Sequence, residues 1–455
     1  MKKFVLSFSA FLPFAFCLGQ NEDSLMIRHI ADEILLHGKA YDNLRYLTKK
    51  IGGRLTASPS WYKAEEWGAN ILKESGADKT WLQECAVPHW VRGGKDIAVA
   101  YCSSAKKNLD AIALGNSLGT GNKAIQGEAV EVLSFDDLEQ KKDSINGKIV
   151  FYNYKFNRAF INTFQAYGDA VKYRVRGASQ AAKYGAVGVV IRSMSESTDN
   201  NPHTGTLQYD TTFAKIPAVA IGLKDADWLD SAFSAGSVKL LVKTNGHFLA
   251  DTIAHNVIGE LTGSEFPEQY ITIGGHLDSW DPAEGANDDG AGVVQTIEIL
   301  RAFKALGYQP RHTIRFVLFA NEENGLRGAL KYAGEAKAKN EKHLFALESD
   351  AGSFTPRAFR IGCSPEQMQK LRRWIPFLFP YGVYQINTGE GGADVGPLRA
   401  SLGVPASELE PDTQRYFDYH HARNDVFANV NKRELELGTV NMAALIYLVD
   451  KYGLD

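Results

Sequence analysis

Three apolar, β-rich runs in the C-terminal half of the chain each end close to residues that bind metal ions in proteins. The runs are YITIGG (270–275), TIRFVLFA (313–320) and LFALES (344–349), and they precede His276, Glu322–Glu323 and Asp350 in that order. A run with apolar residues at helical spacing, 288–307, separates the first two strands. This alternation predicts an α/β fold with a mixed, mostly parallel sheet sandwiched between helices.

Ligand side chains from such strands are expected to converge, because the carboxyl ends of parallel strands form the ligand crevice. Asp288 opens the helical run, where we expect it to cap the helix and bridge two cations. YHHARND (419–425) adds a histidine, and its two adjacent rings would point to opposite sides of a strand. Two imidazoles and three carboxylates suit two zinc ions that share one carboxylate.

Two further acids have a predicted role beside the metal site. Asp278 follows His276 by two residues, so its carboxylate is placed to accept the second imidazole N–H. The pair Glu322–Glu323 offers one carboxylate to a metal and one as general base for a water. Each acid alone is more typical of a solvated surface or a helix cap, and only their joint order predicts a hydrolase.

The rest of the chain predicts three further parts. Lys2 and Lys3 precede an apolar run at 4–18 that is shorter than the ~20 residues of a membrane span, so we predict a secretory signal at 1–19. A helical part with trailing strands occupies 20–104, an inserted α/β module 105–248, and the catalytic domain 249–455. The protein is therefore expected to be secreted or periplasmic.

Composition excludes several classes. The net charge is −3 and no basic block occurs, so we expect no nucleic-acid partner, and no later segment is apolar enough to span a membrane.

The cysteine count leaves two possibilities for a disulfide. Removing Cys17 with the signal leaves Cys85, Cys102 and Cys363. Either Cys85 and Cys102 form a disulfide or all three are buried thiols.

The order HxD, DDGAG, EE, SD and H resembles the M28 zinc exopeptidases, and within them the carboxypeptidase Q group. GHLDSWD (275–281), ESDAG (348–352) and YHHARND carry most of this resemblance, and PHTG (202–205) in the inserted module adds to it. The resemblance implies a peptidase that acts on dipeptides or short peptides with a free terminus. It also implies that 105–248 is a protease-associated domain and that the chain forms a homodimer.

The resemblance further implies a role for each site residue. One zinc ion is expected on His276 and Asp350, the second on Glu323 and His421, and Asp288 between them. Glu322 is then the general base and Asp278 supports His276. The family spacing H-x-x-x-D is met by Asp425, which selects His421. His420 stands where some relatives have a tyrosine that assists the oxyanion, so we keep it as a substrate-binding candidate.

Substrate selection is predicted from one Gly-rich loop, TGEGGADVGPL (388–398). We predict that it lines the pocket, with Glu390 or Asp394 facing a substrate terminus; the alternative is a surface loop. Three rival functions stay open. They are an acyltransferase of the glutaminyl cyclase type with one zinc, an inactive binding protein of the same fold, and a metallophosphoesterase.

Overall fold

The computed structural model describes residues 14–103 and 105–454, with side chains from Glu22 onward. The predicted signal at 1–19 lies for the most part outside these described residues. The first described helix, α1 (Phe14–His37), is held by Asp23, whose carboxylate accepts hydrogen bonds from Tyr447, Lys451 and Tyr452. The N-terminal helix is thus fixed to the last helix of the chain.

The first sheet has eight strands, of which the central four run parallel. Their order is β1 (Lys79–Val91), β10 (His247–Leu261), β12 (His312–Phe319), β11 (Phe266–His276), β13 (Lys342–Glu348), β16 (Ala406–Pro411), β14 (Pro356–Gly362) and β15 (Gln385–Thr388). Antiparallel pairs join β1 to β10, β10 to β12 and β14 to β16. The predicted parallel arrangement is therefore found at the centre, and the antiparallel pairs lie outside it.

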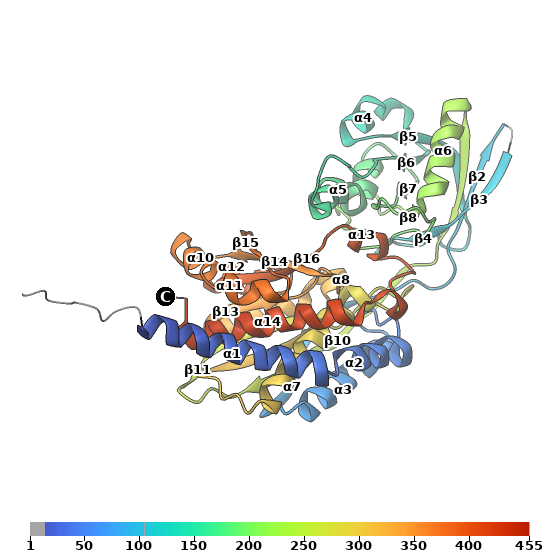
Figure 1. Ribbon diagram of the computed structural model, residues 1–455. Coiled ribbons are helices and arrows are strands. Elements are labelled where there is room, and N and C mark those ends of the chain that lie inside the picture. Colours follow the sequence, from blue (N-terminus) through green and yellow to red (C-terminus); the bar gives the residue numbers. More distant parts are fainter. Residues whose placement is uncertain (1–13, 104, 455) are drawn as a thin grey trace, which may run out of the picture.

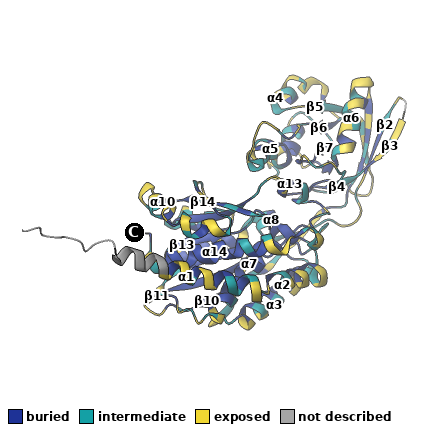
Figure 2. Cartoon of the chain, viewed as in Figure 1, coloured by how far each residue is buried: buried dark blue, intermediate teal, exposed yellow. Residues whose placement is uncertain are grey.

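Helices cover both faces of this sheet, as Figure 1 shows. One face packs against α1, α2 (Ala40–Tyr46), α3 (Pro59–Glu74), α7 (Ala291–Ala305), α10 (Pro365–Arg372), α11 (Ile375–Leu378) and α14 (Lys432–Tyr452). The other face packs against α9 (Arg327–Ala338) and α12 (Gly396–Leu402). Burial is continuous through these layers, and Figure 2 shows the sheet and α14 in the buried colour. The helices thus remove both faces of the parallel strands from water.

The start of α7 differs from the prediction. Asp288 does not cap this helix, because α7 begins at Ala291 with Gly290 at its N-cap. Asp288 lies in the preceding turn η3 (Ala286–Gly290), with an extended backbone and a cis peptide bond to Asp289. Its side chain is consequently aimed by a tight turn and by hydrogen bonds from elsewhere in the chain.

A second sheet forms the inserted module, and it begins earlier than the predicted boundary at 105. Its order is β3 (Ala105–Leu109), β2 (Ile97–Cys102), β9 (Val238–Lys243), β5 (Ile125–Val132), β6 (Ile149–Tyr152), β7 (Gly188–Arg192), β8 (Ala218–Ile221) and β4 (Ala111–Ala113). β2 belongs to this sheet because it pairs with β3 and β9. The boundaries of the module therefore fall between β1 and β2 and between β9 and β10.

Helices also cover both faces of the second sheet. α4 (Phe135–Gln140) and α5 (Thr163–Ala182) pack on one face, and α6 (Leu223–Ala235) packs on the other. The remaining short helices are η1 (Leu47–Ile51), η2 (Lys142–Ser144), α8 (Glu322–Gly325), η4 (Phe379–Tyr381), α13 (Tyr416–Tyr419) and η5 (Phe427–Asn429). Two of them, α8 and α13, lie beside the predicted site.

The cysteines match neither predicted alternative in full, because Cys102 and Cys363 are only partly buried. Cys85 is buried and its thiol donates to the Ala254 carbonyl, whereas the Cys102 thiol donates to the Ala105 carbonyl in the other sheet. No disulfide joins them in the described part of the chain.

None of the helices within 14–103 and 105–454 has the length and apolar character that crossing a membrane requires.

Candidate active site

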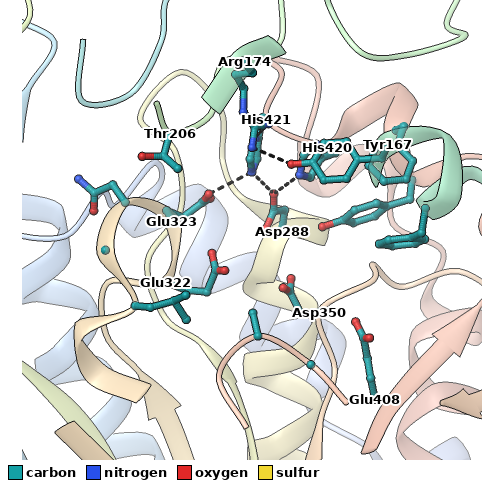
Figure 3. A pocket seen from close by; sticks show the side chains of 18 of the residues that line it. Tyr167, Arg174, Thr206, Asp288, Glu322, Glu323, Asp350, Glu408, His420 and His421 are labelled. Carbon is teal, nitrogen blue, oxygen red and sulfur yellow. Dashed lines mark hydrogen bonds and ion pairs between the residues drawn. The ribbon is translucent and has the colours of Figure 1, made fainter. Parts of the chain in front are cut away.

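The predicted ligand residues converge at the carboxyl ends of the central parallel strands. His276 is the last residue of β11, Glu322 and Glu323 open α8 just after β12, and Asp350 follows β13 by two residues. Asp288 arrives from η3, and His421 follows α13. Figure 3 shows the carboxylates of Glu322, Glu323, Asp288 and Asp350 gathered below the rings of His420 and His421.

The two oxygens of Asp288 face different histidines. Oδ1 lies 3.3 Å from His276 Nε2, and Oδ2 lies 3.2 Å from His421 Nε2. Asp350 Oδ1 completes the first half at 3.4 Å from His276 Nε2. Glu323 Oε2 completes the second half at 3.1 Å from His421 Nε2. The site therefore has two halves that share one carboxylate.

This site is buried and rich in unpaired acceptors. His276 Nε2, Asp288 Oδ2 and Asp350 Oδ1 have no hydrogen-bond partner although each atom is shielded from solvent. Burial, the Asp288 charge and the Glu322 charge hold the pKa of Glu323 well above its ordinary value, despite the opposing effect of His276. Unpaired buried acceptors are costly, and cations remove both the desolvation cost and the repulsion. The residues present thus fit two divalent ions.

Two other residues, Asp289 and His420, lie close enough to be considered as metal ligands. The hydrogen bonds of Asp289 argue against that role. His420 lies farther from Asp288 than His421 does. The ligand atoms of Asp289 lie within 4.8 Å of those of His276 and Asp350. However, Asp289 Oδ2 already accepts the His276 backbone N–H at 3.0 Å, and its Oδ1 accepts the Gly292 N–H at 2.9 Å. Asp289 therefore orients the turn. A second set of possible ligand atoms within 4.8 Å of one another belongs to His420, Asp288 and His421.

His420 and His421 lie in a loop, so the expectation that a strand would point them apart is wrong. Their rings stack with centroids 3.5 Å apart, and both line the same pocket. His421 Nε2 is closer to Asp288 Oδ2 than His420 Nε2 is, at 3.2 Å against 3.9 Å. Burial lowers the pKa of His421 to about 3 although Asp288 opposes the shift. A neutral imidazole is the form that binds a metal.

Asp278 makes contacts different from those predicted. His276 Nδ1 lies 3.1 Å from the backbone carbonyl oxygen of Asp278 and 3.6 Å from its carboxylate. The carboxylate instead accepts the backbone N–H of Glu322 at 3.1 Å and of Glu323 at 3.3 Å. The backbone of Asp278 thus orients the histidine, and its side chain orients the double-glutamate turn.

Among the acids predicted for the site, Glu322 lines the pocket without belonging to either half. Its Oε2 lies 3.9 Å from His276 Nε2, and its side chain is 20% exposed. Burial raises the pKa of Glu322 to about 8; His276 opposes the shift, and Asp350 and Asp278 add to it. A carboxylate of raised pKa beside a buried site is suited to take up and return a proton.

The pocket above the site has a volume of about 520 Å³ and is lined by both modules. The inserted module contributes Asn116, Phe164, Tyr167, Arg174, Thr206 and Gln208. The predicted loop contributes Gly391, Gly392 and Ala393, but not its two acids. Glu390 is 92% exposed beside Arg399, and Asp394 is 1% exposed behind the loop. The structure therefore brings His420, but neither Glu390 nor Asp394, to the pocket.

Two residues that support the site carry little sequence signal. Arg54 is fully buried and donates to the backbone carbonyls of Leu277, Glu284 and Gly285, which fixes the loop after β11. Arg174 lies on α5, in a module with no cluster of metal-type residues in its sequence. The only local signal near Arg54 is the turn-rich sequence around Gly52–Pro59, and the sequence around Arg174 gives no sign of a role at the site.

Comparison with known proteins agrees with this geometry. The profile of Peptidase family M28 matches residues 256–446. Carboxypeptidase Q from Homo sapiens is 33% identical over 421 residues, which cover 91% of this chain and 87% of that protein. Carboxypeptidase Q from Xenopus laevis is 34% identical over 399 residues, which cover 86% of this chain and 82% of that protein.

Solved structures give the same result for the fold. A peptidase M28 precursor from Shewanella amazonensis SB2B superposes with a TM-score of 0.90 at 32% identity, over 94% of this chain and 97% of that one. A zinc aminopeptidase from Bacillus subtilis shares the fold, with a TM-score of 0.64 at 19% identity over 90% and 94% of the two chains. The chain therefore belongs to peptidase family M28, and it is a peptidase.

Proposed function

We propose that this protein is a di-zinc exopeptidase that hydrolyses dipeptides or short peptides with a free terminus. The observation that carries the proposal is the position of Asp288 between two complete half-sites. His276 and Asp350 would hold one zinc ion, and His421 and Glu323 the second. Imidazole and carboxylate ligands in this number suit zinc with open positions for water and substrate. The zinc aminopeptidase of the same fold supports the choice of metal.

The metals would supply one part of the chemistry. When bound, two zinc ions would lower the pKa of the attacking water and polarise the carbonyl of the scissile bond. Burial of the site strengthens both effects because it lowers the local dielectric. The inserted module also lines one side of the pocket, which supports the proposal of a short substrate.

Glu322 would carry the proton. Its carboxylate takes a proton from the attacking water as the new carbon–oxygen bond forms. It then gives that proton to the amide nitrogen as the carbon–nitrogen bond breaks, which releases a carboxylic acid and an amine. The proton of the acid then passes to the amine, which gives a carboxylate and an ammonium group. The raised pKa of Glu322, caused mainly by burial, supports both steps. Asp278 holds Glu322 in place through the Glu322 backbone N–H.

His420 is the pocket residue that we propose to contact the substrate. It lies beside His421, its ring meets Tyr167 edge-on at 5.0 Å, and burial keeps the pKa of His420 well below its ordinary value. A neutral ring at this position can donate a hydrogen bond to a substrate oxygen without repelling a cation. Asn116 and Thr206 of the inserted module provide further neutral polar groups on the opposite wall.

The experiment that tests the function combines metal analysis with a substrate panel. The purified chain is expected to contain two zinc ions and to release amino acids from unblocked dipeptides. Acetylation of the amino end and amidation of the carboxyl end, tested separately, show which terminus must be free. One zinc ion with cyclisation of an N-terminal glutamine supports the acyltransferase alternative, and metal binding without any turnover supports a binding protein.

We also propose that residues 1–19 direct export and that the inserted module is a protease-associated domain. Removal before Gln20 leaves Asp23 and its hydrogen bonds to Tyr447 and Tyr452 intact, so the mature chain keeps the anchor of α1. N-terminal sequencing of the protein recovered from its native host tests the cleavage. A chain that retains Lys2 and Lys3 contradicts it.

A further inference from the structure

His421, the proposed metal ligand, stands at the third position of a tight turn. The Ala422 N–H donates to the Tyr419 carbonyl at 2.9 Å, and His420 at the second position has φ −48° and ψ 122°, as in a type II turn. His421 is therefore the residue of this turn with positive φ. Its φ angle is 59°, in the left-handed region that residues other than glycine rarely adopt. Such a conformation costs free energy and persists only when surrounding contacts hold it. Besides Asp288, Glu323 and the stacked His420, two further contacts on His421 come from the inserted module, outside the part of the chain that the family profile matches.

The first contact is a backbone hydrogen bond from the PHTG segment. Thr204 N–H donates to the His421 carbonyl oxygen at 2.9 Å. Thr204 is itself fixed, since its hydroxyl donates to the Ala113 carbonyl at 2.8 Å and the neighbouring His203 N–H donates to Ser193 Oγ at 2.9 Å. The carbonyl of His421 is thus tied to a rigid part of the second sheet.

The second contact is the guanidinium of Arg174. Its Nη1 lies 3.3 Å from His421 Nδ1, and its Nη2 donates to the Tyr167 hydroxyl at 2.7 Å. Arg174 is 5% exposed, so it fills the space behind the imidazole on the side away from Asp288. Figure 3 shows Arg174 descending from the module onto His421. The ring therefore has little room to swing away from Glu323.

Gly205 makes this packing sterically feasible. Its φ angle is +124°, and a Cβ there would lie 2.5 Å from Arg174 Nη1 and 2.6 Å from His421 Nδ1. Both distances are shorter than heavy atoms tolerate, so any side chain at 205 displaces the arginine, the histidine or both. The glycine of the PHTG motif thus has a specific structural requirement at the metal site.

We infer that Thr204, Gly205 and Arg174 are positioning residues that hold His421 in its metal-binding conformation, so that the inserted module completes one of the two zinc sites. This inference rests on the proposed two-zinc function. It makes the module part of the metal centre as well as a wall of the pocket. The ion held by His421 and Glu323 depends on the module, whereas the ion held by His276 and Asp350 does not.

The test compares Gly205→Ala and Arg174→Ala with two matched controls. Gly236→Ala also adds a side chain at a positive φ, +152°, in the same module, but no atom lies within 4 Å of the added Cβ. Arg176→Ala removes an exposed arginine from the same helix. Each variant of the full chain is equilibrated with buffered free zinc, and the bound zinc per chain is measured with the circular dichroism of the fold.

The expected result is selective loss of one ion. Wild type and both controls bind two zinc ions, whereas each test variant keeps one tight ion and binds the second about 10- to 100-fold more weakly, the range for loss of a group that orients a ligand. Arg174→Ala only truncates a side chain, so it carries the test if Gly205→Ala does not fold. Wild-type affinity for both ions in Arg174→Ala overturns the inference and leaves the proposed function standing. Fewer than two ions in the wild type contradicts the proposed function itself.

Discussion

The buried carboxylate of Asp278 accepts the backbone N–H of Glu322 at 3.1 Å. Its second oxygen faces the next N–H, that of Glu323, at 3.3 Å. One carboxylate, which also lies 3.6 Å from His276 Nδ1, thus sets the direction of both glutamates. Asn321, which precedes them, has a φ angle of 65°, so the turn is a tight one that needs such support.

Asp278→Asn is expected to lower kcat/KM for an unblocked dipeptide by about 10- to 100-fold. The amide keeps one acceptor oxygen but turns an NH₂ donor toward one of the two backbone N–H groups, so the turn loosens. Steady-state kinetics measure the effect, and Asp281→Asn, three residues along the same loop, serves as the control. Equal kcat/KM values for the two variants contradict the role of Asp278.

Asp425→Asn is expected to weaken zinc retention by about 10- to 100-fold. Asp425 Oδ2 accepts the Asp288 N–H at 3.1 Å, and Oδ1 accepts the Asn287 N–H at 2.8 Å, so its carboxylate fixes the backbone of Asp288, the proposed bridging ligand. An amide turns a donor toward one of these donors. Zinc released to a competing chelator measures the change, with the half-buried Asp412→Asn as the control. Unchanged release from Asp425→Asn argues against this support.

Much of the fold could be predicted from the sequence because local patterns determine it. The apolar runs at 270–275, 313–320 and 344–349 appear as β11, β12 and β13 in the centre of the sheet, each followed by its predicted ligand. These strands are buried on both faces, which is why their sequences are continuously apolar. Asp288 is a different case, because the turn that aims it has no pattern that distinguishes it from a helix cap.

Other features depended on long-range packing and could not be predicted. The stacking of His420 on His421 occurs in a turn whose His421 carbonyl also accepts a hydrogen bond from Thr204 of the inserted module. Likewise, Asp394 is turned inward because its backbone N–H donates to Glu348, a residue 46 positions away. Such contacts have no local periodicity, so spacing in the sequence gives no sign of them.

Removal of the metal ions is expected to destabilise the chain as well as inactivate it. The carboxylates of the site are crowded and buried, and several of their atoms have no hydrogen-bond partner. Bound cations would offset the repulsion between these carboxylates. Each ion at a free concentration 100-fold above its Kd stabilises the fold by about 2.7 kcal/mol. Chelation should therefore lower the Tm, and added zinc should restore both Tm and turnover. An unchanged Tm after complete chelation would contradict a metal site of this kind.

A second stability prediction concerns an ion pair far from the site. Glu341 pairs with Arg315 at 2.6 Å; burial opposes ionisation, but hydrogen bonds to His343 and Arg315 lower the pKa of Glu341 to about 2. Since the folded pKa lies below the ordinary 4.5, the stabilisation is present above pH 4.5 and is lost as the pH falls toward 2. Glu341→Gln should cost roughly 2 to 3 kcal/mol at pH 7 and little near pH 2.

Urea unfolding of Glu341→Gln and wild type at pH 7, 4.5 and 3 checks this dependence. The exposed Glu84→Gln is the control and should match wild type at each pH. A difference between Glu341→Gln and wild type that stays constant from pH 7 to pH 3 would show that the ionised pair is not its source.

The most direct measurement on the proposed function is the turnover and zinc content of Glu322→Gln. Glu322 belongs to neither half of the metal site, so the variant should keep two zinc ions and the wild-type fold. It should lose at least ~10²-fold in kcat for an unblocked dipeptide, because an amide does not accept the proton of the attacking water. Two bound zinc ions with near-normal kcat would contradict the role of Glu322 as general base, since another group would then have to carry the proton.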